Sequence, residues 1–160
     1  MKIIAFVGKS DTGKTRLIQS LVAEWKRRGR SVSVIKHCSH GFSLDLEGKD
    51  TWQFMEAGAD QVAMVSSKTV ATIQKRTSEP DLLEIAETVF PSSDLIIIEG
   101  GRRSKNLKKI EVLRSGISET IETPKNELLA VVSDTKLNVD TSAFQPDQIT
   151  ALADFIETQV

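Results

Sequence analysis

The sequence predicts an α/β fold with three layers, built on a largely parallel core sheet with one added β-hairpin. Short apolar runs alternate with amphipathic helical stretches along the chain, which is the pattern of βαβ units. Residues 95–98 are apolar at four consecutive positions, as expected for a strand buried on both faces of a parallel sheet. Residues 61–66 and 69–74 alternate apolar and polar side chains around a two-residue connection, and therefore predict the hairpin.

The first predicted strand, residues 3–7, leads directly into a phosphate-binding pattern. Residues 8–15 read G-K-S-D-T-G-K-T, which matches G-x-x-x-x-G-K-[ST] between a β-type run and a helical stretch. Glycines allow the backbone N–H groups to point at an anion, and the following helix adds the positive end of its dipole. A glycine-containing turn without a ligand is the alternative. The pattern predicts a P-loop NTPase-type site for a nucleoside triphosphate.

Within this loop we assign Lys14 to the β- and γ-phosphates and the Thr15 hydroxyl to Mg²⁺. Lys14 is accordingly a candidate catalytic residue, and Thr15 a candidate metal ligand. The nucleotide-binding candidates from this part of the chain are Gly8, Lys9, Ser10, Asp11, Thr12, Gly13, Lys14, Thr15 and Arg16.

The composition is that of an ordinary globular chain, and we treat residues 1–160 as one nucleotide-binding domain. Hydrophobic residues make up 39% and the net charge is −1, so no basic field draws the chain to nucleic acid or to a membrane. The apolar runs are too short to span a bilayer, and no signal-peptide pattern is present. A single cysteine provides no disulfide framework, so we expect a cytoplasmic protein.

A helix over residues 15–28 and a strand over residues 31–36 follow the phosphate loop. Strand, loop, helix and strand form a βαβ unit, which requires parallel pairing and a right-handed crossover. The apolar face of the helix comprises Leu17, Leu21, Val22 and Trp25.

The polar loop 37–50 leaves the carboxyl end of the second strand, the edge where ligands bind in open α/β sheets. Asp50 serves either in a ligand site or as the cap of a short helix that ends near Gly58. A solvated loop without a ligand role is a further alternative. Zinc is disfavoured, because there are only three candidate groups and no second cluster: His37, Cys38 and His40. The candidates for contact with the nucleotide, its Mg²⁺ or a second substrate are His37, Asp45 and Lys49.

The second half of the chain adds two acidic strand ends. Glu99 closes the buried run 95–98, where a carboxylate can hold Mg²⁺ or orient the attacking water; a cap or salt bridge in the turn is the alternative. We therefore assign Glu99 as a catalytic and metal-binding candidate. Asp134 ends another predicted buried strand, where its carboxylate can accept two hydrogen bonds from a guanine edge. One helix is expected to open with Pro80 in its first turn, and a closing helix is expected from Pro146 to Thr158.

Several motifs follow one another in a specific order: the phosphate loop, Ile35-Lys36-His37 with the later His40 and Asp45, Gly48-Lys49-Asp50, Ala57-Gly58-Ala59, Ile98-Glu99-Gly100, and Ser133-Asp134. In this order and spacing the chain resembles the molybdopterin-guanine dinucleotide biosynthesis protein B family over nearly its whole length. The resemblance implies a small P-loop protein that binds GTP with Mg²⁺, hydrolyses it weakly and forms homodimers. It also implies a partner, the guanylyltransferase that attaches GMP to molybdopterin, and leaves a molybdopterin-type small molecule open as a second ligand.

Two other functions stay open from the sequence. A small-molecule kinase would use the same loop to transfer the γ-phosphate, but it needs lid arginines, for which only Arg102 and Arg103 are obvious. A non-catalytic GTP-sensing adaptor would bind without turnover. The partner surface is expected on the loops 37–50 and 102–109, because both follow strands at the edge that carries the phosphate loop; two solvated loops are the alternative.

Overall fold

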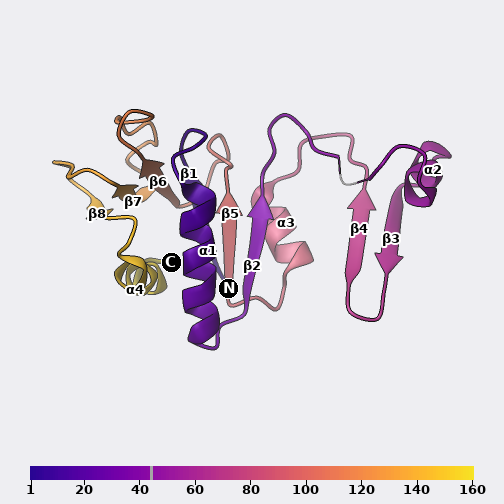
Figure 1. Cartoon of the computed structure of the whole chain (residues 1–160), viewed down its shortest axis with the longest axis horizontal. Helices are drawn as coiled ribbons and strands as arrows, with labels where there is room; N and C mark the ends of the chain where they lie inside the picture. Colours follow the sequence, from indigo (N-terminus) through magenta and orange to yellow (C-terminus); the bar gives the residue numbers. More distant parts are fainter. Residues whose placement is uncertain (44) are drawn as a thin grey trace. The chain divides into compact units, whose positions relative to one another are not determined.

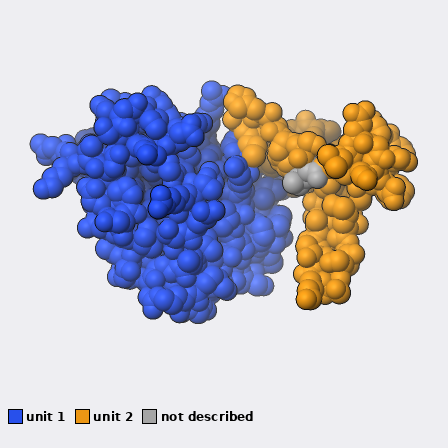
Figure 2. All heavy atoms as spheres, in the orientation of Figure 1, with its two compact units in different colours: residues 1–37, 81–160 blue, residues 38–80 orange. Residues whose placement is uncertain are grey.

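The computed structural model describes residues 1–43 and 45–160. The chain divides into two compact units, drawn in different colours in Figure 2: Met1–His37 with Asp81–Val160, and Cys38–Pro80. The first unit contains the large sheet and the phosphate loop, and the second contains a short helix and a hairpin (Figure 1). In the part of the chain that the structure describes, no helix is long and apolar enough to cross a membrane.

The first unit is built on a six-stranded sheet in which every neighbouring pair of strands is parallel. The strand order is β2-β5-β1-β6-β7-β8. This confirms the predicted parallel core, although β8 is too short to have been recognised in the sequence. The strands are β1 Lys2–Val7, β2 Val32–Lys36, β5 Leu95–Glu99, β6 Lys109–Leu113, β7 Leu128–Ser133 and β8 Ser142–Phe144.

Helices cover both faces of this sheet, which gives the three predicted layers. Successive side chains of a strand point to opposite faces, so Ile4 and Phe6 of β1 join one core cluster and Ala5 and Val7 join the other. The first cluster packs against α1 (Lys14–Arg27) and α4 (Ile149–Gln159), and the second against α3 (Leu82–Val89).

Two helix starts differ from the sequence-based expectation by a few residues. α3 is capped by Asp81, whose side chain accepts a hydrogen bond from the Leu83 N–H at 2.8 Å, so Pro80 lies just outside the helix. α4 begins at Ile149 after Gln148, because the preceding residues form a turn in which the Gln145 N–H donates to the Gln148 side chain.

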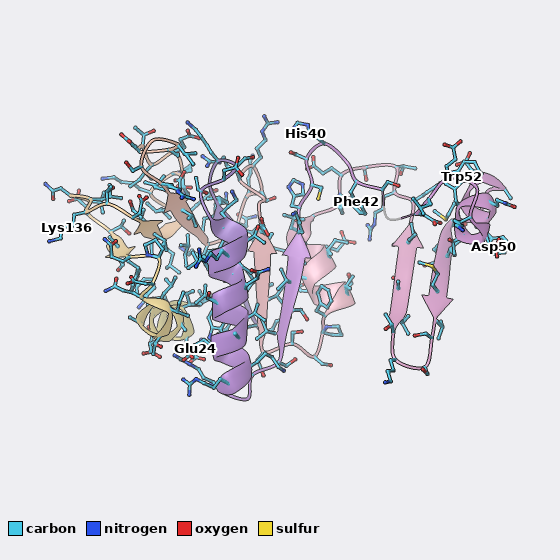
Figure 3. All side chains as sticks on the ribbon, in the orientation of Figure 1. Glu24, His40, Phe42, Asp50, Trp52 and Lys136 are labelled. Atoms are coloured by element: carbon cyan, nitrogen blue, oxygen red, sulfur yellow. The ribbon has the colours of Figure 1, made fainter. Side chains whose placement is uncertain are left out.

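The second unit consists of α2 (Asp50–Glu56) and the antiparallel hairpin β3 (Gln61–Val65) and β4 (Val70–Gln74). The hairpin is therefore confirmed, with Gln61 opposite Gln74. Asp50 is the first residue of α2 and its N-cap is Lys49, so the expected capping role of Asp50 is wrong. Figure 3 labels Asp50 and Trp52 on this helix.

Candidate functional site

The phosphate loop joins β1 to α1 at the carboxyl edge of the sheet, where two glycines fix its shape. Gly8 has a φ of +153°, and a Cβ there would lie 2.4 Å from the Val112 carbonyl oxygen, so no larger residue fits against β6. Gly13 has a φ of +92° in the left-handed region and precedes the first turn of α1. The sequence pattern therefore corresponds to a loop that follows β1, packs against β6 and ends at the N-terminus of α1.

Side chains inside the loop are tied to its own backbone. The Lys14 ammonium and the Thr12 hydroxyl both donate to the Lys9 carbonyl oxygen, the hydroxyl at 3.0 Å. Burial lowers the pKa of Lys14; the Glu99 carboxylate opposes this effect, and the Arg102 charge adds to it. A phosphate beside Lys14 would stabilise the charged ammonium that burial disfavours, which suits the role assigned to this residue.

Thr15 and Glu99 meet although they are 84 residues apart. The Thr15 hydroxyl donates to the Glu99 carboxylate at 2.8 Å. Glu99 is placed there because β5 pairs in parallel with β1, with Phe6 opposite Glu99, so both strand ends lie beside the loop. Neighbouring oxygen ligands of one Mg²⁺ lie roughly 2.9 Å apart when each is about 2.0–2.1 Å from the ion. The pair therefore fits two positions on a magnesium ion.

The other assigned residues divide between the two units. His37 follows β2, and its N–H donates to the Glu99 carbonyl oxygen at 2.9 Å, which places it at the same edge of the sheet. Asp45 and Lys49 belong to the second unit, so their contact with a nucleotide stays a prediction. Among the described residues, no group of three or more His, Cys, Asp or Glu side chains could hold a metal ion.

Asp134 lies at the end of β7, on the side of the phosphate loop away from Glu99 in the strand order. Its carboxylate accepts a hydrogen bond from the Ser115 N–H at 2.9 Å, because β6 and β7 are parallel neighbours and their loops meet. It lines a pocket of about 420 Å³ that Thr12 and Gly13 of the phosphate loop also line. The structure thus brings Asp134 and the loop to one cavity.

The basic segment after Glu99 is less free than its sequence suggests. Arg102 forms ion pairs with Glu122 and with Glu111, whose side chain is fully buried in β6. Lys109 is also buried: its ammonium donates to the carbonyl oxygens of Arg102 and Ser104 and pairs with the carboxylate of Glu127. Arg102 and Lys109 are therefore engaged in contacts that fix the segments around β6. The other basic residues of this segment remain the candidates for a partner surface.

Sequence reasoning missed this network and one further cation. Arg114 follows β6, and its guanidinium donates to the Asp11 carbonyl oxygen of the phosphate loop at 3.3 Å. Lys9 of the loop lies 3.8 Å from the Glu122 carboxylate. The sequence held no direct signal for this network, because the alternation in 109–113 indicates a half-exposed strand. The burial of Lys109 and Glu111 in the structure is what shows that they need partners.

Comparisons with known proteins agree with this geometry. Residues 3–134 match the family described as molybdopterin guanine dinucleotide synthesis protein B, MobB. The chain is 32% identical over 157 residues to the molybdopterin-guanine dinucleotide biosynthesis adapter protein of Haemophilus influenzae, covering 97% of this chain and 87% of that protein. It is 31% identical over 159 residues to the protein of the same name from Escherichia coli, covering 96% and 90%.

Solved structures show the same fold. A crystal structure of molybdopterin-guanine biosynthesis protein B superposes with a TM-score of 0.77 and 27% identity, covering 99% of both chains. The structure of Bacillus subtilis MobB has a TM-score of 0.75 at 22% identity, covering 100% of this chain and 98% of that one. The relatives and the fold agree over nearly the whole length and the family match covers residues 3–134, so the chain belongs to the MobB family.

Proposed function

We propose that the chain binds GTP with Mg²⁺ on the phosphate loop and acts as an adapter in the biosynthesis of molybdopterin guanine dinucleotide. The observation that carries the nucleotide site is the Thr15–Glu99 hydrogen bond of 2.8 Å beside a loop that also presents Lys14. The adapter role is supported by the names of the relatives. The partner enzyme would be the guanylyltransferase that joins GMP to molybdopterin, with molybdopterin itself as a second candidate ligand.

The chain's own residues suit binding better than rapid turnover. Lys14 would exchange the Lys9 carbonyl for phosphate oxygens, and Thr15 and Glu99 would hold Mg²⁺, which supplies charge stabilisation when bound. Glu99 is also the group placed to orient a water, so we propose weak GTP hydrolysis with Glu99 and Lys14 as the catalytic pair. Kinase activity is less well supported, because Arg102 is engaged with Glu111 and Glu122.

Three further proposals concern assembly and specificity. A preference for guanine would rest on Asp134, whose carboxylate can accept from base N–H groups that adenine lacks. A homodimer is supported by the apolar hairpin, where the side chains of Val65 and Val70 are 74% and 66% exposed. A single nucleotide-binding domain over residues 1–160 is supported by a family match that includes parts of both units. We retain the cytoplasm as the proposed location.

The test compares wild type with Lys14→Ala in calorimetric titrations with GTP and ATP, with and without Mg²⁺. GTP should bind wild type more tightly than ATP, and Lys14→Ala should lose roughly 10- to 100-fold in affinity, the range for one hydrogen bond to a charged group. Lys26→Ala is the matched control, since Lys26 lies in the last turn of α1.

The adapter role needs a second measurement. Dinucleotide formation by the guanylyltransferase from molybdopterin and GTP should rise when the wild-type chain is added, and less so with Lys14→Ala. Equal GTP affinity in wild type and Lys14→Ala would refute the site. Unchanged dinucleotide formation on addition of wild type would refute the adapter role.

A further inference from the structure

The pocket beside the phosphate loop has a second set of polar groups that the phosphate site does not use. It is lined by the loop, α1, the ends of β6 and β7, and the start of α4, and its volume is about 420 Å³. We propose that this α1–α4 pocket receives the nucleoside of the bound triphosphate, and that Arg114 and Asp147 determine its affinity. The inference rests on the proposed triphosphate site and extends it to the base and ribose.

The position of the pocket fits a nucleoside joined to phosphates in the loop. Thr12 and Gly13 belong to both the phosphate loop and the pocket wall. A single ligand can therefore place its phosphates in the loop and its nucleoside in the pocket. Its volume falls within the roughly 300–1,000 Å³ of typical small-molecule sites. Apolar side chains are also part of the lining, among them the partly exposed Ile149, which suits the flat faces of a base.

Arg114 is held where it can contact a base. Its hydrogen bond of 3.3 Å to the Asp11 carbonyl oxygen ties the guanidinium to the phosphate loop, while the residue stays exposed and lines the pocket. A planar guanidinium can stack on a base, and it can also donate to the two acceptors on one edge of guanine. Arg16, one turn into α1, adds a second cation to the same lining.

Asp147 has a carboxylate that does not cap α4. It stands before α4, but the N-cap is Gln148, and the Ile149 N–H donates to the main-chain carbonyl of Asp147 at 2.8 Å. Among the residues that the structure describes, the Asp147 carboxylate has no hydrogen-bond or ion-pair partner, and it lines the pocket. A carboxylate in such a place can accept from ribose hydroxyls or from base N–H groups.

Together these groups complement guanine better than adenine. Guanine carries two acceptors on one edge and N–H donors on another, which match arginine side chains and the carboxylates of Asp134 and Asp147. Adenine lacks the carbonyl acceptor and the paired donors, so it would form fewer of these contacts. The pocket therefore accounts for a guanine preference through several residues and not through Asp134 alone.

The experiment separates the nucleoside from the phosphates. Calorimetric titrations with Mg²⁺ compare GTP with inorganic tripolyphosphate, which has no base or ribose, for wild type, Asp147→Asn and Arg114→Ala. Each variant should bind GTP about tenfold more weakly, as expected for the loss of one charge-assisted contact. The affinity of Asp147→Asn for tripolyphosphate should stay within about twofold of wild type. Arg114→Ala should lose more affinity for GTP than for tripolyphosphate, with some loss for both, because Arg114 also donates to the Asp11 carbonyl oxygen of the phosphate loop. Asp140→Asn is the control for Asp147→Asn, because Asp140 is exposed and lies outside the pocket lining.

Each result bears on a different claim. Unchanged GTP affinity in both variants would overturn the pocket assignment and leave the phosphate site standing. An equal loss for GTP and tripolyphosphate would also overturn it, because the substitutions would then act through the loop. Wild type that binds neither ligand would refute the proposed function itself. Both substituted residues are exposed, and thermal unfolding of each variant checks that the fold is kept.

Discussion

Glu111 provides the sharpest test of the network behind the phosphate loop. Its side chain is fully buried in β6, where one carboxylate oxygen accepts the N–H groups of Glu122 at 3.0 Å and Thr123 at 2.8 Å. The other oxygen lies 3.2 Å from the Arg102 guanidinium. Glu111→Ala would remove all three contacts and leave the buried Thr123 N–H, the partly buried Glu122 N–H and the half-buried guanidinium without this partner.

The expected loss of stability is large for a single substitution. Hydrogen bonds to a charged group contribute about 1.5–3 kcal/mol each, and removing one member of a buried ion pair costs about 3–5 kcal/mol. These contributions share one carboxylate and do not add, so we expect Glu111→Ala to lower the free energy of unfolding by about 3–5 kcal/mol. Glu111→Gln should lose less, because an amide oxygen can still accept the two N–H groups.

Urea unfolding with linear extrapolation measures these differences. Glu122→Gln is the matched control, because it removes the other carboxylate paired with Arg102. The Glu122 side chain is 42% exposed, so this substitution should lower the free energy of unfolding by about 1 kcal/mol or less. If Glu111→Ala costs under about 1 kcal/mol, the carboxylate does not organise the loop after β6, and the reasoning from burial and hydrogen bonding is refuted.

Two further predictions concern carboxylates in other settings. Glu99→Gln should keep nucleotide binding but reduce its Mg²⁺ dependence and any GTP hydrolysis, measured by titration and phosphate release; wild-type values in both assays would make Glu99 purely structural. Hydrogen bonds from Arg27 and Arg28 lower the pKa of Glu24 (labelled in Figure 3) from 4.5 to about 2. A lowered carboxyl pKa stabilises the fold above pH 4.5, and this stabilisation is lost as the pH falls towards 2. Between pH 4.5 and 2, Glu24→Gln should therefore lose less stability than wild type, as measured by acid titration followed by circular dichroism. If the stability of both proteins falls equally over this range, Glu24 does not contribute to acid sensitivity.

The phosphate loop and the meeting of Thr15 with Glu99 could be predicted, because they depend on local pattern and on the topology of a parallel sheet. A glycine-rich motif between a strand and a helix specifies the loop, whatever the rest of the chain does. Parallel strands joined by right-handed crossovers bring their carboxyl ends to one edge, and β5 is the direct neighbour of β1, so Glu99 at the end of β5 lies near Thr15. The hydrogen bond between them follows from those two facts.

The network around β6 could not be predicted, because it depends on which loops cover the strand. Residues 109–113 alternate polar and apolar side chains, which usually indicates a half-exposed strand, yet all five are buried. Lys109 and Glu111 are covered by the segments that supply their partners, Glu127 and the N–H groups of Glu122 and Thr123. Tertiary contacts of that kind leave no periodic signal in the sequence.

The same network explains why Lys14, and not the nearby arginine, is the cation available to phosphate. Arg102 is paired with a fully buried carboxylate, and withdrawing it would leave Glu111 without its counter-charge, at a cost of about 3–5 kcal/mol. Among the described residues, the Lys14 ammonium donates to the neutral Lys9 carbonyl alone, and breaking such a hydrogen bond costs about 1 kcal/mol. On the proposed function, we therefore expect an incoming triphosphate to engage Lys14 rather than Arg102. A lid that needs Arg102 would work against the fold, which favours a nucleotide-binding adapter over a kinase.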